Sequence, residues 1–419
     1  MLRFFRTRSA RKFFRQKLAV VALVITAGYL LLSLLVAAGL ITTAEADAPI
    51  GPRHVPGFFV QDTPEKRLGF AEFYLEKADT AVKKAAALEA ASELELAQLT
   101  GEKQTEAAAA AKLAVQETLE RAGFLRLQLA DRPVSELQAI VARGWKLYEK
   151  LAVSEELNEQ PQLQEQLAEL EGITAALYPQ PTGWNGFVHR LHMSLGTDRQ
   201  GRSIFLRAVY SIKVAIKVGV VTALASVLIG TLLGGAAAFF GGWIDHVVTW
   251  LYTMLSSIPY MVLLIVLVYA FMGTMFDGTL VPLYVAMIAT FWIGPCRVMR
   301  GETLKLKEME YVQAAQAMGF GRWYTLLRHV LPNAAHLMLI NFSLLFIGAI
   351  KSEVILSFLG LGVKGEPSWG IMISQSGSEV ITGFFWQIGA ATAFMFFLVL
   401  AFNVLSDAIQ DAYDPKHNG

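Results

Sequence analysis

The sequence predicts an all-α, polytopic membrane protein with six transmembrane helices and an inserted extracytoplasmic arm, built as a helical hairpin or coiled coil. Of the 419 residues, 54% are hydrophobic and only 17% are charged, against about 45–50% and about 25% in ordinary soluble domains. The charges are missing from several runs that are long enough to cross a bilayer. One long stretch between these runs is instead rich in alanine, glutamate and leucine, which are strong helix formers.

The first charge-free run covers residues 18–41 and exceeds the about 20 residues that a membrane-spanning helix needs. A basic tail, residues 1–17, precedes it and carries Arg3, Arg6, Arg8, Arg11, Lys12, Arg15 and Lys17. The positive-inside rule keeps such a tail in the cytoplasm. A cleaved signal peptide is the alternative, because Ala44-Glu45-Ala46 resembles a cleavage site. Signal-peptide apolar cores are only about 7–15 residues long, which favours a retained anchor.

Five further apolar runs follow in the second half, at residues 218–244, 247–276, 278–296, 333–350 and 380–406. Six crossings that start inside return the C-terminus to the cytoplasm. Counted from the first anchor, the loop between the fourth and fifth spans, residues 297–332, is then cytoplasmic, and its excess of basic residues supports this orientation. We expect Pro259 to kink the third span, and we expect Gly230, Gly234 and Gly235 to allow close helix packing.

Residues 42–195 form the predicted insert. Helix breakers are few over residues 64–122, and the main interruption is Gly101. Asp131-Arg132-Pro133 predicts a helix start with aspartate as N-cap and proline in the first turn, and residues 154–170 predict a further helix. The insert is interpreted either as a docking arm for a partner or as a solvated spacer, since it contains no catalytic constellation.

Residues 310–332 predict a helix, a glycine stop at Gly319, a second short helix and a proline stop at Pro332. Ala314 and Ala315 leave one face flat for close approach by another surface. Such an element suits docking into a groove on another protein. A connector that skirts the membrane is the alternative.

This segment resembles the EAA loop of ABC-importer permeases, in which Glu-Ala-Ala is followed at fixed spacing by glycine and by Ile-x-Leu-Pro. Gln313-Ala314-Ala315, Gly319 and His329-Val330-Leu331-Pro332 keep the spacing. Glutamine and histidine replace the usual glutamate and isoleucine. Glu310-Tyr311-Val312 and the histidine are typical of the dipeptide/oligopeptide branch.

Other stretches are similar to the same branch over residues 196–416, and the insert is not. One is the GTDxxGR segment with Gly196, Thr197, Asp198, Gly201 and Arg202, taken as an extracytoplasmic motif. An aspartate that is usual near Thr253 is absent. Lys351 and Glu353 are charged at membrane depth and are therefore candidates for the transport pathway. Snorkelling or a structural ion pair is the alternative for both.

The resemblance implies a membrane permease subunit of an ATP-driven importer for peptides or related small solutes, not an enzyme and without a cofactor of its own. ATP is then hydrolysed on a partner, in keeping with the lack of a G-x-x-x-x-G-K-[ST] motif in this sequence. The ATPase-coupling residues are Glu310, Tyr311, Gln313, Ala314, Ala315, Gly319, His329, Leu331 and Pro332.

The implied partners are ABC ATPase subunits, a second homologous permease, an extracytoplasmic solute-binding protein and the lipid bilayer, with no nucleic acid. The resemblance implies the inner membrane, and the basic tail with six crossings predicts that both termini are cytoplasmic. The expected domains are 1–17, 18–41, 42–195, a permease core at 196–416 with five transmembrane helices and the EAA loop at 301–332, and a tail at 417–419. A non-ABC channel and a membrane scaffold that acts through its outer arm are the alternative functions.

Overall fold

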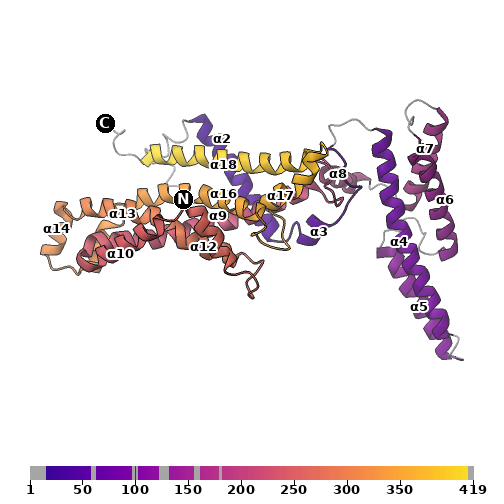
Figure 1. The fold of residues 1–419 in the computed structure, drawn as a ribbon, viewed down its shortest axis with the longest axis horizontal. Coiled ribbons are helices and arrows are strands. Elements are labelled where there is room, and N and C mark those ends of the chain that lie inside the picture. The colour runs from indigo at the N-terminus through magenta and orange to yellow at the C-terminus, as the bar shows by residue number, and fades with distance from the viewer. Residues whose placement is uncertain are drawn as a thin grey trace. The chain divides into compact units, whose positions relative to one another are not determined.

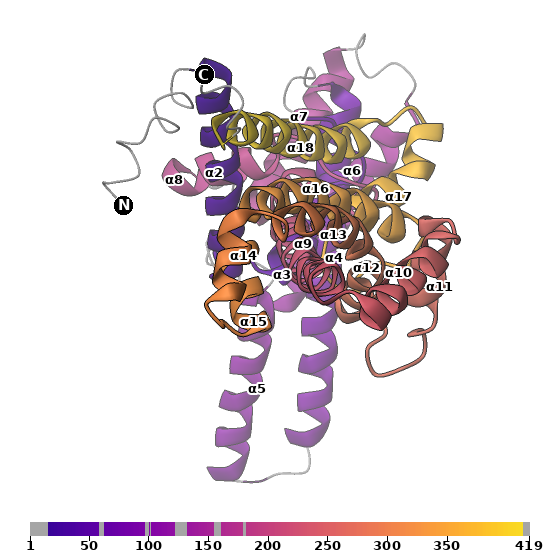
Figure 2. The ribbon, with the colours of Figure 1, turned by 90° about the vertical axis from the view of Figure 1, so that its left-hand side faces the viewer.

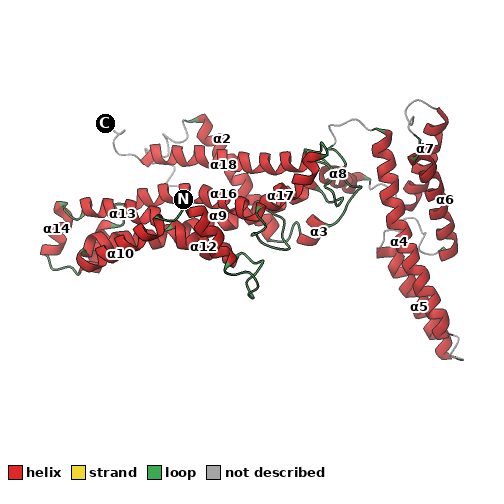
Figure 3. Cartoon of the chain, in the orientation of Figure 1, coloured by secondary structure: helices red, strands yellow, loops and turns green. Residues whose placement is uncertain are grey.

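The computed structural model describes residues 16–57, 63–96, 100, 102–121, 132–154, 161–178 and 182–413. These residues form helices joined by turns, and the only β-structure among them is two isolated bridges (Figure 3). The all-α prediction is therefore confirmed. The chain divides into two compact units. Unit 1 consists of Met1–Asp47 and Leu206–Gly419, and unit 2 is Ala48–Phe205.

Unit 1 contains the membrane-spanning candidates. Among the residues that the structure describes, five helices are long and apolar enough to cross a bilayer, and a bent helix pair raises the number to six if it counts as one span. The five are α2 (Lys17–Ala37), α9 (Ile204–Phe240), the α12–α13 pair (Val281–Phe291 and Ile293–Leu306), α16 (Ala335–Phe358) and α18 (Trp386–Tyr413). The bent pair is α10 (Gly242–Ser256) with α11 (Tyr260–Tyr269).

The break between α10 and α11 bends the chain by 89°. Pro259 stands directly before α11, and proline cannot donate the backbone hydrogen bond that a continuous helix would require. The predicted interruption of this span is thus confirmed. Helix α9 extends beyond the charge-free run that it contains, because it begins at Ile204, well before residue 218.

Successive spans of unit 1 run between two ends. At one end, the last turn of α9 packs with α13 and with α14 (Glu310–Ala317) through Phe240, Met299 and Val312. At the other end, Lys364 Nζ lies 2.9 Å from Asp277 Oδ1, which joins the loop after α16 to the loop after α11. This hydrogen bond holds the pKa of the Asp277 carboxyl below its usual value. Figures 1 and 2 show α2 crossing α18, and Tyr29 Oη donates to the Phe394 carbonyl at 2.9 Å.

Two glycines allow α9 to approach α12 and α13 at backbone distance. A Cβ atom at Gly230 would lie 2.4 Å from the Trp292 carbonyl oxygen, and one at Gly234 would lie 2.2 Å from that of Cys296. Close packing through small residues is a usual means of joining helices in lipid, where the hydrophobic effect does not drive association. The expectation of close packing at these two glycines is confirmed.

Within the described part of unit 2, four helices pack around one core: α4 (Pro64–Leu96), α5 (Glu102–Arg121), α6 (Val134–Ala152) and α7 (Pro161–Leu177). Helix α8 (Gly183–His192) follows them. The α4 helix contacts all three others. Its buried positions carry small side chains as well as leucine, since Leu75, Ala78 and Val82 all lie in the core. A bidentate pair of Arg67 with Glu171, at 2.6 Å for both contacts, joins α4 to α7.

The predicted helix boundaries in unit 2 are only partly right. The interruption of the first long helical region near Gly101 is confirmed by the end of α4 and the start of α5. Asp131 lies outside the described residues, and Pro133 directly precedes α6 rather than occupying its first turn. The predicted start at Ser154 is wrong: this residue lies in non-helical chain, and α7 begins at Pro161.

We expect Gly234→Ala to lower the free energy of unfolding of unit 1 by about 1–3 kcal/mol, the usual cost of overpacking. The added Cβ would meet the Cys296 carbonyl, and a backbone atom cannot move aside as a side chain can. Gly28→Ala is the matched control, because a Cβ on that α2 glycine meets nothing within 4 Å. Thermal unfolding in detergent micelles measures both variants. Equal melting temperatures for the two would contradict the backbone contact.

Candidate functional site

Residues 310–332 fold as the sequence predicts, into two short helical pieces around a glycine. The first is α14, and the second is α15 (Arg322–Thr325), which continues into a π-helical turn (Leu326–Val330). Gly319 lies between them with φ of 85°, a left-handed conformation that glycine adopts without steric cost. We call residues 310–332 the EAA segment.

The inner face of the EAA segment is packed into the membrane-spanning bundle. Val312, Leu326 and Val330 are fully buried, and Leu331 is buried beside them. Their partners are Met299 on α13 and the last turn of α9. A bidentate ion pair of Arg300 with Asp245, at 2.6 and 2.7 Å, joins α13 to the first turn of α10. The segment therefore packs against α9 and α13, and α13 is in turn joined to α10.

The outer face of the EAA segment is exposed and unusually aromatic. Its exposed large side chains are Tyr311, Met318, Phe320, Trp323, Tyr324 and Leu327. The Phe320 and Tyr324 rings stack with centroids 5.1 Å apart, and Trp323 lies 4.7 Å from the Phe240 ring. The sequence prediction named only Tyr311 from this set. The others lie in residues 316–324, which are exposed throughout, and at residue 327, and no alternation of buried and exposed positions marks them in the sequence.

The predicted coupling residues divide between the two faces. Glu310, Gln313 and Ala314 are exposed on α14, whereas the adjacent Ala315 is buried. Neighbouring helical positions point about 100° apart, so only Ala314 of the alanine pair is accessible to another molecule. Pro332 is exposed and His329 is half-buried.

Asn333 fastens the end of the segment to its beginning. Its Nδ2 atom donates to Tyr311 Oη at 2.8 Å and to the His329 carbonyl at 2.9 Å. These bonds bring together two residues that the sequence prediction assigned to the same function. The segment is thus closed on itself as well as packed against α9 and α13.

The GTDxxGR residues form a clamp within unit 2. Asp198 Oδ1 accepts from the backbone N–H of Gln200 and of Arg202, and Oδ2 accepts from Arg202 Nε at 2.7 Å. Thr197 Oγ1 donates to the Pro52 carbonyl at 2.5 Å and accepts from the Val55 N–H. All five predicted motif residues lie together here, and each is buried. Their contacts hold residues 49–57 beside the start of α9.

The two pathway candidates are not brought together. Lys351 is exposed on α16, and Glu353 is 1% exposed two residues later. Ser357 Oγ donates to Glu353 Oε1 at 2.6 Å, and the Ser368 hydroxyl also hydrogen-bonds this carboxyl. Ser368 caps α17 (Trp369–Ile381) through the Ile371 N–H. The Glu353 carboxyl therefore joins α16 to the N-terminus of α17.

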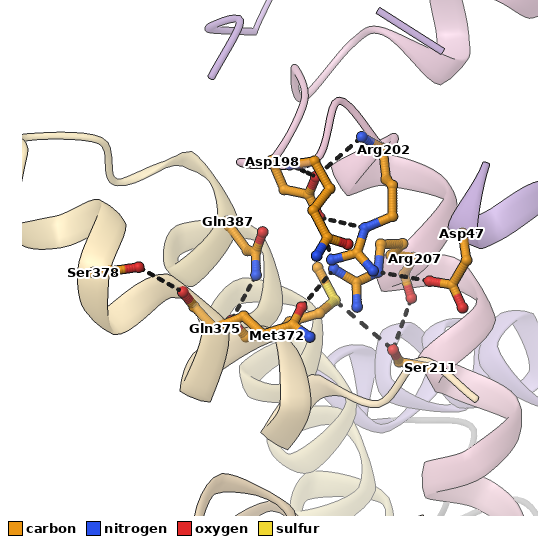
Figure 4. Close-up of polar contacts among 10 residues, drawn as sticks. Asp47, Asp198, Arg202, Arg207, Ser211, Met372, Gln375, Ser378 and Gln387 are labelled. Atoms are coloured by element: carbon orange, nitrogen blue, oxygen red, sulfur yellow. Dashed lines mark hydrogen bonds and ion pairs between the residues drawn. The ribbon is translucent and has the colours of Figure 1, made fainter. Parts of the chain in front are cut away.

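Arg207 is a buried guanidinium that the sequence prediction missed. It is 2% exposed in the first turn of α9. Its Nη1 donates to Gln375 Oε1 on α17 at 3.0 Å, and its Nε lies 3.4 Å from Asp47 Oδ1 at the end of α3 (Thr43–Asp47). Figure 4 shows both partners reaching the guanidinium. The sequence feature that could have identified Arg207 is an arginine at the start of a long apolar helix, because an ionised group there needs polar partners.

The neighbouring contacts extend this polar cluster across unit 1. Ser211 Oγ donates to the Arg207 carbonyl at 2.7 Å, and Gln387 Nε2 on α18 donates to the Met372 carbonyl at 2.8 Å (Figure 4). Helices α3, α9, α17 and α18 are thereby connected by polar contacts at the end opposite the EAA segment. Within the described residues, no group of three or more histidine, cysteine or acidic side chains could hold a metal ion.

We expect Gly196→Ala to destabilise unit 2 more than Gly183→Ala does. Both glycines have positive φ, 79° and 61°, so both variants carry the same kind of backbone strain. Only at Gly196 would the Cβ also meet a backbone oxygen, that of Val55 at 2.1 Å, whereas at Gly183 it meets nothing within 4 Å. The difference should be about 1–3 kcal/mol, the cost of overpacking alone. Limited proteolysis of the full chain against temperature measures it, and equal sensitivity of the two variants would contradict the clamp.

The permease-like part of the chain matches known proteins. The family model described as binding-protein-dependent transport system inner membrane component matches residues 226–418. The chain is 36% identical over 222 residues to the dipeptide transport system permease protein DppC of Bacillus subtilis. The aligned region covers 53% of this chain and 68% of that relative.

Two further relatives agree. The oligopeptide transport system permease protein OppC of Bacillus subtilis is 35% identical over 222 residues, 53% of this chain and 71% of its own length. The glutathione transport system permease protein GsiD of Pectobacterium atrosepticum is 34% identical over 223 residues, 53% of this chain and 72% of its own length. The chain belongs to the family of binding-protein-dependent transport system inner membrane components, as a multi-pass permease of the dipeptide and oligopeptide ABC-transporter branch.

Proposed function

We propose that this chain forms half of the translocation pathway of an ATP-driven importer for peptides or related small solutes. A separate ATPase docks on the EAA segment and drives the spans. The observation that carries the proposal is the two-faced construction of the segment. Its inner face is buried against α9 and α13, and its outer face exposes aromatic and apolar side chains.

The exposed face has the chemistry of an interface core. Tyrosine, tryptophan, phenylalanine and methionine are enriched where proteins bind one another, and all four are exposed here. Glu310 stands in the first turn of α14 and is placed to pair with a basic residue of the ATPase. Because the inner face is packed without a flexible linker, rotation of the ATPase subunits is passed to α9 and α13, which opens the pathway to each side in turn.

The remaining partners follow from the same assignment. The relatives are named as permease proteins of transport systems, and such a system includes a second homologous permease, two ATPase subunits and a solute-binding protein. The EAA segment then faces the cytoplasm with both termini, and unit 2 is extracytoplasmic. The excess of basic residues between α12 and α16 supports this orientation.

A non-ABC channel and a membrane scaffold are less well supported. Neither alternative explains an exposed docking surface at the end of the helix bundle. The relatives are also named as transport-system permeases. Gentle purification of the tagged chain from its native membranes, with identification of the proteins that accompany it, distinguishes the three. An ATPase and a second permease are expected. Recovery of the chain alone, under conditions that keep other ABC importers assembled, would contradict the proposal.

We expect Met318→Glu to lower the amount of ATPase that co-purifies by at least about tenfold, because a charge buried in the core of an interface costs more than 1.4 kcal/mol. Met318 is 70% exposed in the free chain, so the variant should fold. Ile381→Glu is the control, since Ile381, the last residue of α17, is 87% exposed at the opposite end of unit 1. Equal loss in both variants would point to a general defect. Unchanged co-purification of the ATPase with both variants would contradict the EAA segment as the docking site.

We expect Gly319→Glu to abolish transport while the protein still inserts, and Gly319→Asn to retain most of it. The φ of 85° at this position is costly for ordinary residues, whereas asparagine tolerates the left-handed region. The comparison separates backbone geometry from the presence of a side chain, since a Cβ here meets nothing within 4 Å. Solute uptake into proteoliposomes with the reassembled importer measures both. Equal activity of the two variants would show that the angle at Gly319 is not required.

A further inference from the structure

Unit 2 contains a cavity of about 410 Å³ that the proposed function does not use. Small-molecule sites in proteins usually measure about 300–1,000 Å³, so this cavity is large enough to hold a small organic compound. Three helices and a loop supply its lining: α4, α7, α8 and residues 55–56. All of them belong to unit 2, so the cavity lies within a single compact unit.

Contacts between α4 and α7 hold two walls of the cavity in place at two levels. At one level, the bidentate pair of Arg67 with Glu171 joins the helices, with both contacts at 2.6 Å. At the other, the ring of Tyr74 stacks on that of Tyr178, directly after α7, with centroids 5.5 Å apart. All four residues also line the cavity. The cavity is therefore preformed, as small-molecule sites usually are.

A row of aromatic rings forms one side of the cavity. Phe70 and Tyr74 stand one turn apart on α4, and their rings stack with centroids 6.5 Å apart. Tyr178 continues the row, because its ring lies within 25° of parallel to that of Tyr74. Burial raises the pKa of the Tyr178 hydroxyl, which therefore stays protonated and can donate a hydrogen bond. This side suits a flat aromatic group on a ligand.

The charged side chains of the lining are mainly basic. Among the described lining residues, Lys66, Arg67 and Arg190 are cationic, and Glu171 is the one carboxylate. Burial lowers the pKa of His189 below its ordinary value, so this imidazole is neutral at pH 7. The lining thus carries an excess of two positive charges, which attracts an anion.

Arg190 is the side chain placed to hold that anion. It is exposed on α8, and its Nε donates to the Gly186 carbonyl at 3.4 Å, which fixes the guanidinium beside its own helix. Its two Nη groups make no hydrogen bond to the described residues. A guanidinium presents its N–H donors in a planar fork that matches the two oxygens of a carboxylate.

We propose that this cavity binds a small carboxylate that carries an aromatic group. The ring lies against Phe70 and Tyr74, and the carboxylate is held by Arg190, with Lys66 adding positive charge. The apolar contact supplies affinity, and the charged contact fixes the orientation of the ligand. The proposal concerns unit 2 alone and does not depend on how the spans of unit 1 move a solute.

The first test titrates three compounds into the full chain in detergent micelles by isothermal titration calorimetry. N-acetylphenylalanine has both the ring and the carboxylate, its amide lacks the charge, and N-acetylglycine lacks the ring. We expect the Kd of N-acetylphenylalanine to be at least about tenfold lower than that of either other compound, because each lacks one of the two contacts. Absence of binding, or equal affinity for the acid and either analogue, would overturn the proposal.

Two adjacent alanines of α7 locate the site. Ala175 and Ala176 are both exposed, and of the two only Ala175 lines the cavity. We expect Ala175→Phe to fill the cavity and raise the Kd of N-acetylphenylalanine at least about tenfold, whereas Ala176→Phe should bind like the unchanged protein. A compound bound among the spans of unit 1 would be unaffected by either variant. That result, or an equal loss in both variants, would overturn the proposal.

The charged contact is tested by Arg190→Gln, which should fold normally because Arg190 is exposed. We expect it to raise the Kd of N-acetylphenylalanine about tenfold and to leave that of the amide unchanged, since only the acid loses a charge-assisted contact. Arg143→Gln is the matched control, because Arg143 is an exposed arginine of α6 that pairs with Glu169 and does not line the cavity. Equal affinity of the two variants for the acid would overturn the proposal.

Discussion

Unit 1 depends on the backbone-level contact of α9 with α12 and α13. Gly230 and Gly234 bring the α9 backbone against the carbonyls of Trp292 and Cys296. In hydrocarbon, where apolar burial does not hold helices together, this proximity is the main source of attraction between them. The EAA segment and the Arg207 cluster both contact the helices of this contact. The EAA segment packs on the last turn of α9 and on α13, and the Arg207 cluster gathers other helices around the first turn of α9.

The sequence predicts the spans well because a charged side chain is unfavourable in lipid, so long charge-free runs identify the membrane helices. The charge-free run does not mark where helix α9 begins. The helix starts at Ile204, and it accommodates Arg207 through Gln375 and Asp47. Partners that are distant in the chain cannot be read from the local pattern. The start of α7 was misplaced because glutamate and glutamine favour helix wherever they stand, and nothing in their type marks residue 161 as the boundary.

The candidate site shows a similar division. The helix, glycine and proline order of the EAA segment followed from the chemistry of single residues, and the structure agrees. Which side chains face outward depended on how the segment packs on α9 and α13, so the exposure of Trp323 and Leu327 was not predicted. The GTDxxGR residues were recognisable as a pattern, but their contacts with residues 49–57 required the folded chain.

Because unit 2 has its own apolar core, formed by side chains of α4 to α7, the protein contains two cooperative folding units in one chain. A polypeptide of this kind does not lose its structure in one all-or-none step, and a single melting temperature then describes neither part. Calorimetry on the intact chain should resolve two heat-absorption peaks with separate enthalpies. A ligand or lipid that acts on one unit would move one peak and leave the other in place, so each peak reports on its own part of the molecule.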